Sequence, residues 1–591
     1  MRRLRSVLTA VLLMGTAGPA GASEPSSGGV TDPSLATIVD AYWAEAEARD
    51  VGAQLQQGRV VGNIPAGTLE EARETVEMAA RHLRKLRGLR LEHLDDEDRL
   101  TAETLQWSLA QRLNAENLWW YEFPVTPYST FDLTIASQAL AANPLASDAD
   151  REAYLSLLDA IGARLEATRA RLERQAGRGI RLPAPAAGPA RQLFEALGAR
   201  FAAIPEQTQA RVSVLSADVQ QSFLAEVQRL VDGRIETARS ALVAALARAE
   251  RDGPSQVGLG QYPGGKAAYR DLVRFHTSLD LSPEQVVTYG ELRIAEINAQ
   301  IETLARQLGV EGGRAGIKTM LRRDARFIAK TADDVASRYR KALGRIAPKI
   351  PQYFSTVPRS PYGVRRLDPA SEGGMTFGYY QPPTPGSPTG EYHFNGSRLE
   401  DRSLVFAVGI IYHELVPGHH FQIALQLENL SLPPFRRMFG EFGFNAYNEG
   451  WAEYAAGLAD EMGLLDDPYD RLGRLMLEAF LTTRLVVDPG LNYFGWSLER
   501  ARAYMRENTY QSDTEIDSET LRYSTAIPGQ ALGYKIGDKT LYEMRRAVEA
   551  KQGTDFDIRA FHAELLGHGA MPLVVLRDHV SRRFKTGQIS P

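Results

Sequence analysis

The chain has 591 residues, of which 44% are hydrophobic and 24% are charged, so it is long enough to bury a large core. Its 68 basic and 73 acidic side chains leave a net charge of −5 without long runs of like charge, which argues against nucleic acid and anionic membranes as partners. The absence of cysteine excludes a cysteine nucleophile, a thiolate metal site and disulfides. Any metal must therefore be held by histidine and carboxylate side chains.

The first 22 residues have the layout of a secretory signal peptide. Three arginines at positions 2, 3 and 5 precede an apolar stretch over residues 7–14, and Ala20-Gly21-Ala22 offers a small-residue cleavage site before Ser23. An N-terminal membrane anchor is the alternative, but the apolar stretch is well short of the ~20 residues that a span needs. We therefore expect an exported protein, periplasmic or secreted, with no transmembrane segment in the mature chain.

The mature chain is predicted to be one mainly α-helical domain over residues 34–591, after a flexible terminus at residues 23–33. Its first lobe, residues 34–255, is rich in good helix formers. The clearest window places apolar side chains on one helix face at Phe223, Leu224, Val227, Leu230, Val231 and Ile235. A second lobe is expected over residues 256–591.

The second lobe is predicted to be helical, with one interruption. Helices are expected up to about residue 348. Residues 351–396 are rich in proline, glycine and tyrosine, and the segment 391–395 is a plausible strand, so we expect a small β-ribbon there. Helices are expected again from there to the end of the chain.

Three of the ten histidines lie within eight residues, at His413, His419 and His420. The preceding segment, residues 404–412, is apolar on nearly all sides, which is typical of a buried helix. Such a helix would deliver His413 and Glu414 from the core to a cavity at its end. The alternative is a buried glutamate among ordinary core histidines, but three histidines beside one glutamate favour a metal site.

His413-Glu414 begins like the H-E-x-x-H zinc helix, in which two histidines one turn apart bind zinc and the glutamate is the general base. Here the fourth residue after His413 is Pro417, which cannot donate the helical hydrogen bond and collides with the preceding turn. The helix must therefore bulge or break. A bulge of two residues would bring His419 to the ligand position, and a bulge of three would bring His420.

A third metal ligand is expected in the segment 448–454, where Glu449 and Glu453 share one helix face at a spacing of four residues. One carboxylate can bind the metal while the other orients a histidine ligand. The alternative is a solvated helix face, which the neighbouring tryptophan, tyrosine and alanine residues make less attractive.

The chain resembles the bacterial family known as domain of unknown function 885. The segments that carry the resemblance are His413-Glu414-Leu415-Val416-Pro417-Gly418-His419-His420-Phe421-Gln422, Glu449-Gly450-Trp451-Ala452-Glu453-Tyr454 and Pro528-Gly529-Gln530-Ala531-Leu532-Gly533-Tyr534-Lys535-Ile536-Gly537. Members of the family are typically exported proteins or lipoproteins. The resemblance covers most of the mature chain.

More distantly, the chain resembles the helical gluzincin peptidases, which include angiotensin-converting enzyme and carboxypeptidase Taq, through His413-Glu414, Gly418-His419 and Asn448-Glu449-Gly450. That resemblance implies a zincin-like, two-lobed helical shell around a deep channel lined by a short β-ribbon. It implies His413, His419 and Glu449 as zinc ligands and Glu414 as general base. Two extra residues separate the histidines here, so His420 remains an alternate ligand, as does Glu453.

The sequence therefore predicts an exported zinc hydrolase, with peptides or peptide-like molecules as substrates. Glu414 would take a proton from the attacking water. Candidates for stabilising the oxyanion are Tyr534, Tyr523 and Arg522. A zinc amidase or esterase acting on a non-peptide substrate would use the same site, and a metal-binding protein without catalysis is the alternative from another class. The oligomeric state is not predicted.

Overall fold

The structure is a computed structural model that describes residues 28–128, 131–213, 215–369, 372, 378–384, 386–438 and 444–589. The described residues form a mainly helical protein with a small β-sheet, as the sequence predicts. The predicted signal peptide, residues 1–22, lies outside them. None of the described helices is both long enough and apolar enough to cross a membrane.

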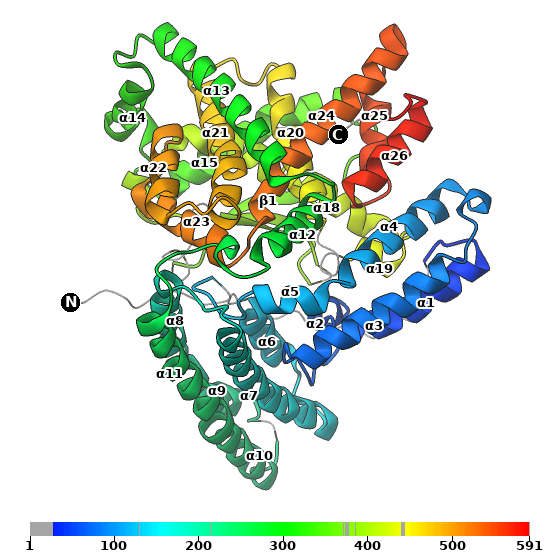
Figure 1. Ribbon diagram of the computed structural model, residues 1–591, viewed down its shortest axis with the longest axis vertical. Helices are drawn as coiled ribbons and strands as arrows, with labels where there is room; N and C mark the ends of the chain where they lie inside the picture. Colours follow the sequence, from blue (N-terminus) through cyan, green and yellow to red (C-terminus); the bar gives the residue numbers. More distant parts are fainter. Residues whose placement is uncertain are drawn as a thin grey trace.

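The N-terminal part of the chain forms the lower portion of the molecule in Figure 1, where long helices lie roughly alongside one another. The apolar window at residues 223–235 runs from α10 through a short π-helical segment towards α11, and five of its six apolar side chains are buried. The helices are α1 (Pro33–Glu47), α2 (Val51–Gln56), α3 (Leu69–Leu86), α4 (Asp96–Arg112), α5 (Ala115–Tyr121), α6 (Phe131–Ala142), α7 (Asp148–Gly177), α8 (Ala184–Ala202), α9 (Ile204–Arg211), α10 (Ala217–Arg229) and α11 (Glu236–Asp252).

Residues 28–32, which belong to the segment predicted to be flexible, are anchored by hydrogen bonds. The amide of Gly29 donates to the carbonyl of Ser431 at 2.9 Å. The amides of Thr31 and Asp32 donate to the carboxylate of Asp98 at 3.1 and 2.7 Å. Asp32 then caps α1 through its side chain, so the ordered helix begins directly after this anchor.

The C-terminal part forms the upper portion of Figure 1. Its helices are α12 (Gly265–Thr277), α13 (Pro283–Gln307), α14 (Gly313–Arg323), α15 (Ala332–Ile346), α16 (Ile350–Tyr353), α17 (Ala407–Glu414), α18 (His419–Glu428), α19 (Pro434–Arg437), α20 (Asn445–Glu461), α21 (Pro468–Asn492), α22 (Leu498–Asn508), α23 (Asp513–Thr525), α24 (Gly533–Gln552), α25 (Ile558–Leu566) and α26 (Leu573–Phe584). Helix α21 is buried along most of its length and packs against α13, α17 and α22.

The predicted β-ribbon is a three-stranded mixed sheet of β1 (Tyr362–Arg366), β2 (Gly378–Gln381) and β3 (Gly390–Phe394). Strand β3 lies in the centre, parallel to β1 and antiparallel to β2. The strand expected at residues 391–395 is thus present one residue earlier. The third strand is β1, which comes from an earlier part of the same segment, residues 351–396, and pairs with β3 in parallel.

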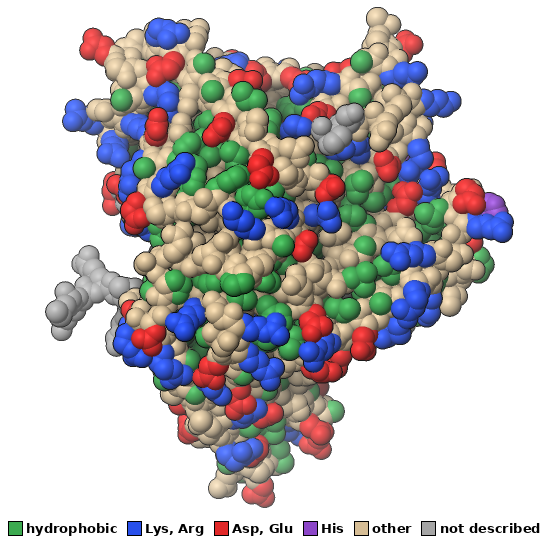
Figure 2. Space-filling model, viewed as in Figure 1, with side chains coloured by type: hydrophobic (Ala, Val, Ile, Leu, Met, Phe, Trp, Pro, Cys, Tyr) green, Lys and Arg blue, Asp and Glu red, His purple; other side chains and the backbone are tan. Residues whose placement is uncertain are grey.

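The surface carries both signs of charge. On the face shown in Figure 2, acidic and basic side chains are interspersed over both portions of the molecule. This mixture agrees with the small net charge of the sequence.

Candidate metal centre

Helix α17 carries His413 and Glu414 out of the core. Residues 407–413 are all buried, and Glu414 is the last helical residue and half-buried. The amide of Leu415 still donates to the carbonyl of Ile411 at 2.9 Å, but its backbone then leaves the helical region with φ −112° and ψ −95°. His413 and Glu414 therefore lie at the C-terminal end of α17.

The helix is interrupted between Glu414 and His419. It does not form the two-residue bulge that would keep one helix continuous. Pro417 lies in the break, and α18 starts afresh at His419. Gly418 fits tightly there, since a Cβ atom on it would lie 1.8 Å from the carbonyl oxygen of His413. Trp451 donates its indole N–H to the carbonyl of Pro417 at 3.0 Å, which anchors the break to α20.

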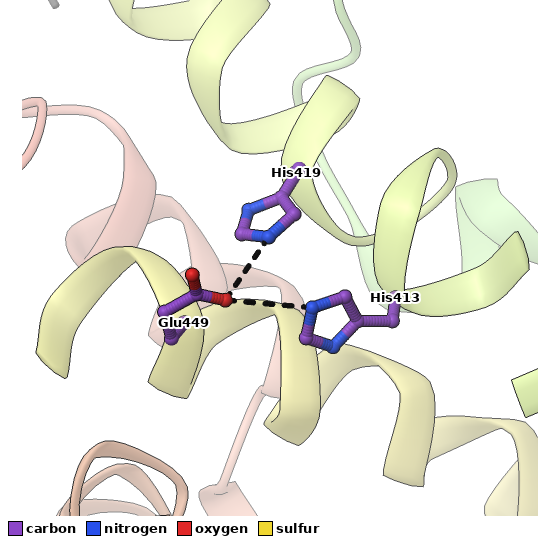
Figure 3. Close-up of side chains that lie close together, drawn as sticks. All are labelled: His413, His419 and Glu449. Atoms are coloured by element: carbon purple, nitrogen blue, oxygen red, sulfur yellow. Dashed lines mark ion pairs between the residues drawn. The ribbon is translucent and has the colours of Figure 1, made fainter. Parts of the chain in front are cut away.

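The break turns His419 back towards His413, and Glu449 of α20 reaches both (Figure 3). Glu449 Oε2 lies 3.5 Å from His413 Nε2 and 3.2 Å from His419 Nε2. The three ligand atoms all lie within 4.8 Å of one another. Zinc with bonds of about 2.0–2.1 Å in tetrahedral geometry separates its ligand atoms by about 3.3 Å. The observed spacing therefore fits a zinc ion.

Hydrogen bonding at the cluster also leaves room for a cation. Glu449 Oε2 is buried and has no hydrogen-bond partner of good geometry among the described residues. A buried carboxylate oxygen without a partner is costly. Two imidazole nitrogens and one carboxylate oxygen are a donor set that suits zinc and leaves one position open.

The two alternate ligands have other partners. His420 is fully buried, and its Nδ1 and Nε2 lie 3.0 Å from the hydroxyl of Tyr380 and 3.1 Å from the carbonyl of Ser360. Glu453 Oε1 lies 3.0 Å from His413 Nδ1, so it contacts the ring nitrogen that faces away from Glu449. These positions suit supporting roles better than metal ligation.

Glu453 is itself held by buried cations. Arg474 Nη2 lies 3.0 Å from Glu453 Oε2, and Lys535 Nζ lies 3.9 Å from the same oxygen. Burial would raise the pKa of Glu453, but Arg474 and His413 outweigh it and hold the pKa well below its usual range. Neither Arg474 nor Lys535 is a site residue that sequence reasoning identified, because Arg474 lies 61 positions from His413 in an ordinary helical pattern.

Burial alone would lower the pKa of His413, but the neighbouring carboxylates of Glu449 and Glu453 raise it to about 10. The same contacts outweigh burial at Glu449 and hold the pKa of that carboxyl well below its usual range. The cluster is thus an environment that stabilises positive charge, whether on a proton or on a metal ion.

The second and third sequence motifs meet where α20 crosses α24. A Cβ atom on Gly450 would lie 2.4 Å from Gly537 Cα, and one on Gly537 would lie 1.9 Å from the carbonyl oxygen of Ala446. Only glycine permits this backbone approach. The crossing brings Tyr534 of α24 beside the cluster, with its ring stacked on that of His413 at 6.0 Å between centroids.

Tyr534 is the oxyanion candidate nearest to the cluster. Burial raises the pKa of Tyr534, and the negative charge of Glu449 raises it further, so the phenol keeps its proton. Arg484, a residue that the sequence did not point to, lies over the Tyr534 ring at 4.7 Å. The hydroxyl is therefore a donor next to the proposed ligand carboxylate.

Tyr523 and Arg522 belong to a neighbouring cluster around Glu519. Tyr523 is fully buried and donates its hydroxyl to Glu519, and Arg522 Nη1 lies 3.1 Å from the same carboxylate. Arg484 Nη2 also lies 3.2 Å from Glu519. The Tyr523 hydroxyl is therefore already hydrogen-bonded to Glu519. Arg522 is close enough to Tyr534 for the two to interact through their charges.

Glu414 lies beside the sheet. Burial raises the pKa of Glu414, and His413 and His419 act in the opposite direction. The backbone of Tyr380, in edge strand β2, favours the ionised form of the Glu414 carboxyl and so also acts to lower its pKa. The carboxylate is thus close enough to the two histidines to be affected by their charge, without forming part of the triad.

A cavity of about 310 Å³ lies elsewhere, at the far end of α18. Its lining includes Phe354, Val357, Leu425, Glu428, His562 and Leu566. It contains none of the predicted site residues. The deep channel expected from the gluzincin resemblance stays a prediction.

Comparison with known proteins identifies the family. Residues 50–580 match the family described as "Bacterial protein of unknown function (DUF885)". The chain belongs to this family. A search of curated proteins finds no match.

Two solved structures of bacterial proteins share the fold. One, from Colwellia psychrerythraea and described as a candidate lipoprotein, is 23% identical with a TM-score of 0.82, covering 93% of this chain and 99% of its own. The other, from Shewanella oneidensis and described as a candidate lipoprotein of unknown function, is 17% identical with a TM-score of 0.74, covering 92% and 98%. At these identities the likeness concerns the fold alone.

A third structure, described as a candidate oligoendopeptidase F from Bacillus anthracis, is 12% identical and covers 87% of this chain and 95% of its own. Its TM-score is only 0.22, so it carries no argument about fold or activity.

Proposed function

We propose that this DUF885 protein is a zinc-dependent hydrolase that cleaves peptide bonds. The observation that supports this most strongly is the cluster of His413, His419 and Glu449, whose ligand atoms lie within 4.8 Å of one another. Glu414 follows His413 directly, and the charges of His413 and His419 act on the pKa of its carboxyl. Zinc hydrolases commonly combine an open metal position with an adjacent base.

In this proposal each residue has one role. His413, His419 and Glu449 hold the zinc ion, which when bound acidifies a water molecule and polarises the substrate carbonyl. Glu414 accepts the proton of the attacking water and passes it to the leaving amine. Glu453 fixes the ring of His413, and the Tyr534 hydroxyl donates a hydrogen bond to the developing oxyanion.

The test of the metal centre is zinc content per chain in purified variants. Replacing His413, His419 or Glu449 by alanine should each remove one zinc equivalent relative to the unmodified protein. The matched control is His420→Ala, which changes the neighbouring histidine and should keep that equivalent. If His420→Ala loses zinc while His419→Ala keeps it, the ligand assignment is wrong.

The test of the substrate class is a panel of free peptides, peptides blocked at either end, and simple esters. We expect chelator-sensitive cleavage of at least one peptide. Cleavage of esters or non-peptide amides alone would replace the peptidase by the zinc amidase or esterase that shares this chemistry. Failure to cleave any of them, with zinc bound, would favour a metal-binding protein without catalysis.

Export is also part of the proposal. It is supported by the layout of residues 1–22 and by the lipoprotein descriptions of the two proteins of like fold. Sequencing the N-terminus of the protein isolated from cells should find Ser23 first. An intact Met1 on membrane-bound protein would contradict it.

A further inference from the structure

A second histidine–carboxylate cluster lies at the C-terminal end of the chain. Glu564 of α25, His568 just after that helix and His579 of α26 place three ligand atoms within 4.8 Å of one another. Glu564 Oε2 lies 3.3 Å from His568 Nε2 and 3.1 Å from His579 Nε2. These spacings are again close to the separation of about 3.3 Å expected around tetrahedral zinc.

The surroundings of this cluster repeat those of the first centre. His568 Nδ1 lies 2.6 Å from Glu97 Oε2, as His413 Nδ1 lies 3.0 Å from Glu453. Glu97 is in turn paired with Arg436 at 2.6 Å, and the Arg436 side chain is fully buried. A metal-ligating histidine commonly donates its other ring nitrogen to a carboxylate in this way. Glu97 would therefore fix the ring of His568.

We propose that Glu564, His568 and His579 bind a second divalent transition-metal ion, for which zinc is the probe, and that this ion has a structural role. The side chains are 17%, 25% and 6% exposed, so water can complete the coordination shell. The donor set of two imidazoles and one carboxylate suits zinc. The remaining oxygen of Glu564 stays paired with Arg583 at 2.7 Å.

The site joins parts of the chain that are far apart in sequence. Glu97 is in α4, Arg436 in α19, and the three ligands in or next to α25 and α26; these helices adjoin at the right of Figure 1. Helices α4 and α26 pack together, and Arg582 Nη2 lies 3.2 Å from Glu103 across the same boundary. A metal ion here would link α25 and α26 to each other and, through Glu97, to α4 of the N-terminal part.

The competing explanation is an ion-pair cluster with protonated histidine, because both histidines also form hydrogen bonds to Glu564 without any ion. The two explanations differ in what zinc does. Only a metal site gains stability from added zinc, because an ion that binds the folded state alone stabilises it. The stability of an ion-pair cluster would not change when zinc is added.

The experiment uses the full-length chain, stripped by chelation and then given zinc. Zinc content and Tm are measured in two variants. The first, called the background, is His413→Ala/His419→Ala, which lacks the first centre. The second carries His579→Gln in addition. We expect one zinc per chain and a zinc-dependent rise in Tm in the background, and neither after His579→Gln. A background that binds no zinc would overturn the proposal.

Two further variants separate ligands from neighbours. Arg583→Gln removes an ion pair of Glu564 but no proposed ligand, so it should keep the zinc and the Tm rise. Glu97→Gln should weaken zinc binding about 10–100-fold, as expected for a residue that orients a ligand. If the background folds poorly, His579→Gln alone should lower the zinc content of the otherwise unmodified protein from two to one. An unchanged content would equally overturn the second site.

Discussion

At the scale of single residues, the candidate centre depends on which atom of each side chain faces the cluster. The His413 ring directs its Nε2 towards Glu449 because its Nδ1 contacts Glu453. His420, one residue after His419, faces away because Tyr380 and Ser360 occupy its ring nitrogens. Side-chain direction, rather than residue type, thus separates the proposed ligands from their neighbours.

Glu414→Gln tests the general base. It preserves the shape of the side chain and leaves the three proposed ligands intact, so zinc content should stay unchanged. Turnover should fall by about 10²–10⁴-fold, which is the usual contribution of general-base catalysis. Steady-state rates and zinc analysis on the same preparation provide the measurement. A variant that keeps most of its activity would contradict the assigned mechanism.

Tyr534→Phe tests the oxyanion donor, and Tyr523→Phe is its matched control. Removing one such donor costs about 10²–10³-fold in turnover with little change in substrate binding. We expect this loss at position 534, where the ring stacks on His413, and not at 523, where the hydroxyl already donates to Glu519. Measuring kcat and KM for both variants shows which tyrosine donates to the oxyanion. The opposite pattern would exchange their roles.

At the scale of secondary-structure elements, the centre depends on one helix break and one helix crossing. The break after Glu414 lets α18 restart at His419, and Gly418 permits the close return of the chain. The crossing of α20 and α24 brings Glu449 and Tyr534 together through backbone contact at glycines. Both features require the absence of a side chain at a defined position.

Gly450→Ala tests the crossing. The added methyl group would lie 2.4 Å from Gly537 Cα, so the backbones must separate. We expect a loss of about 1–3 kcal/mol in the free energy of unfolding, as for overpacked cores, together with weaker zinc binding. Gly344→Ala in α15 is the control, since its methyl group would meet nothing within 4 Å. That control should be neutral or stabilising by up to about 1 kcal/mol. Equal behaviour of the two variants would refute the crossing as a determinant of the site.

At the scale of the whole molecule, stability depends on buried polar groups that join distant segments. His562 of α25 is fully buried, with Nδ1 at 2.9 Å from the carbonyl of Tyr353 and Nε2 at 2.8 Å from the hydroxyl of Tyr454. The carbonyl can only accept, so Nδ1 carries the proton and Nε2 accepts from the phenol. Burial lowers the pKa of His562 to about 3.

This histidine predicts a pH dependence of stability. Between about pH 3 and pH 6.5 the unfolded chain binds a proton at His562 that the folded chain does not, so stability rises with pH across this window and is fully present above it. The contribution to the slope is about 1.4 kcal/mol per pH unit. His562→Gln should flatten the acid side of the unfolding profile by that amount, whereas His93→Gln, at an exposed histidine, should not. Indistinguishable slopes in the two variants would contradict the neutral, buried state of His562.

Much of the fold class followed from local patterns. The apolar face around Phe223 to Ile235 and the apolar run before His413 are helical because their spacing buries one side or all sides of a helix, and the strand near residues 391–395 is present. Proline at 417 excluded a regular zinc helix without a bulge or break, for reasons of backbone chemistry alone. The residue types needed for a metal centre were also visible, because histidine and carboxylate side chains were the only strong ligands in a chain without cysteine.

What only the tertiary structure decided is which of these side chains meet. The choice between a bulge and a break, and the orientations of His419 and His420, depend on contacts with Trp451, Ser360 and Tyr380, which are distant in sequence. The anchoring of Glu453 by Arg474 and the cluster of Glu564, His568 and His579 with Glu97 have no local signature for the same reason. Periodicity reports which face of an element is buried, whereas a coordination geometry is set by the packing of several elements against one another.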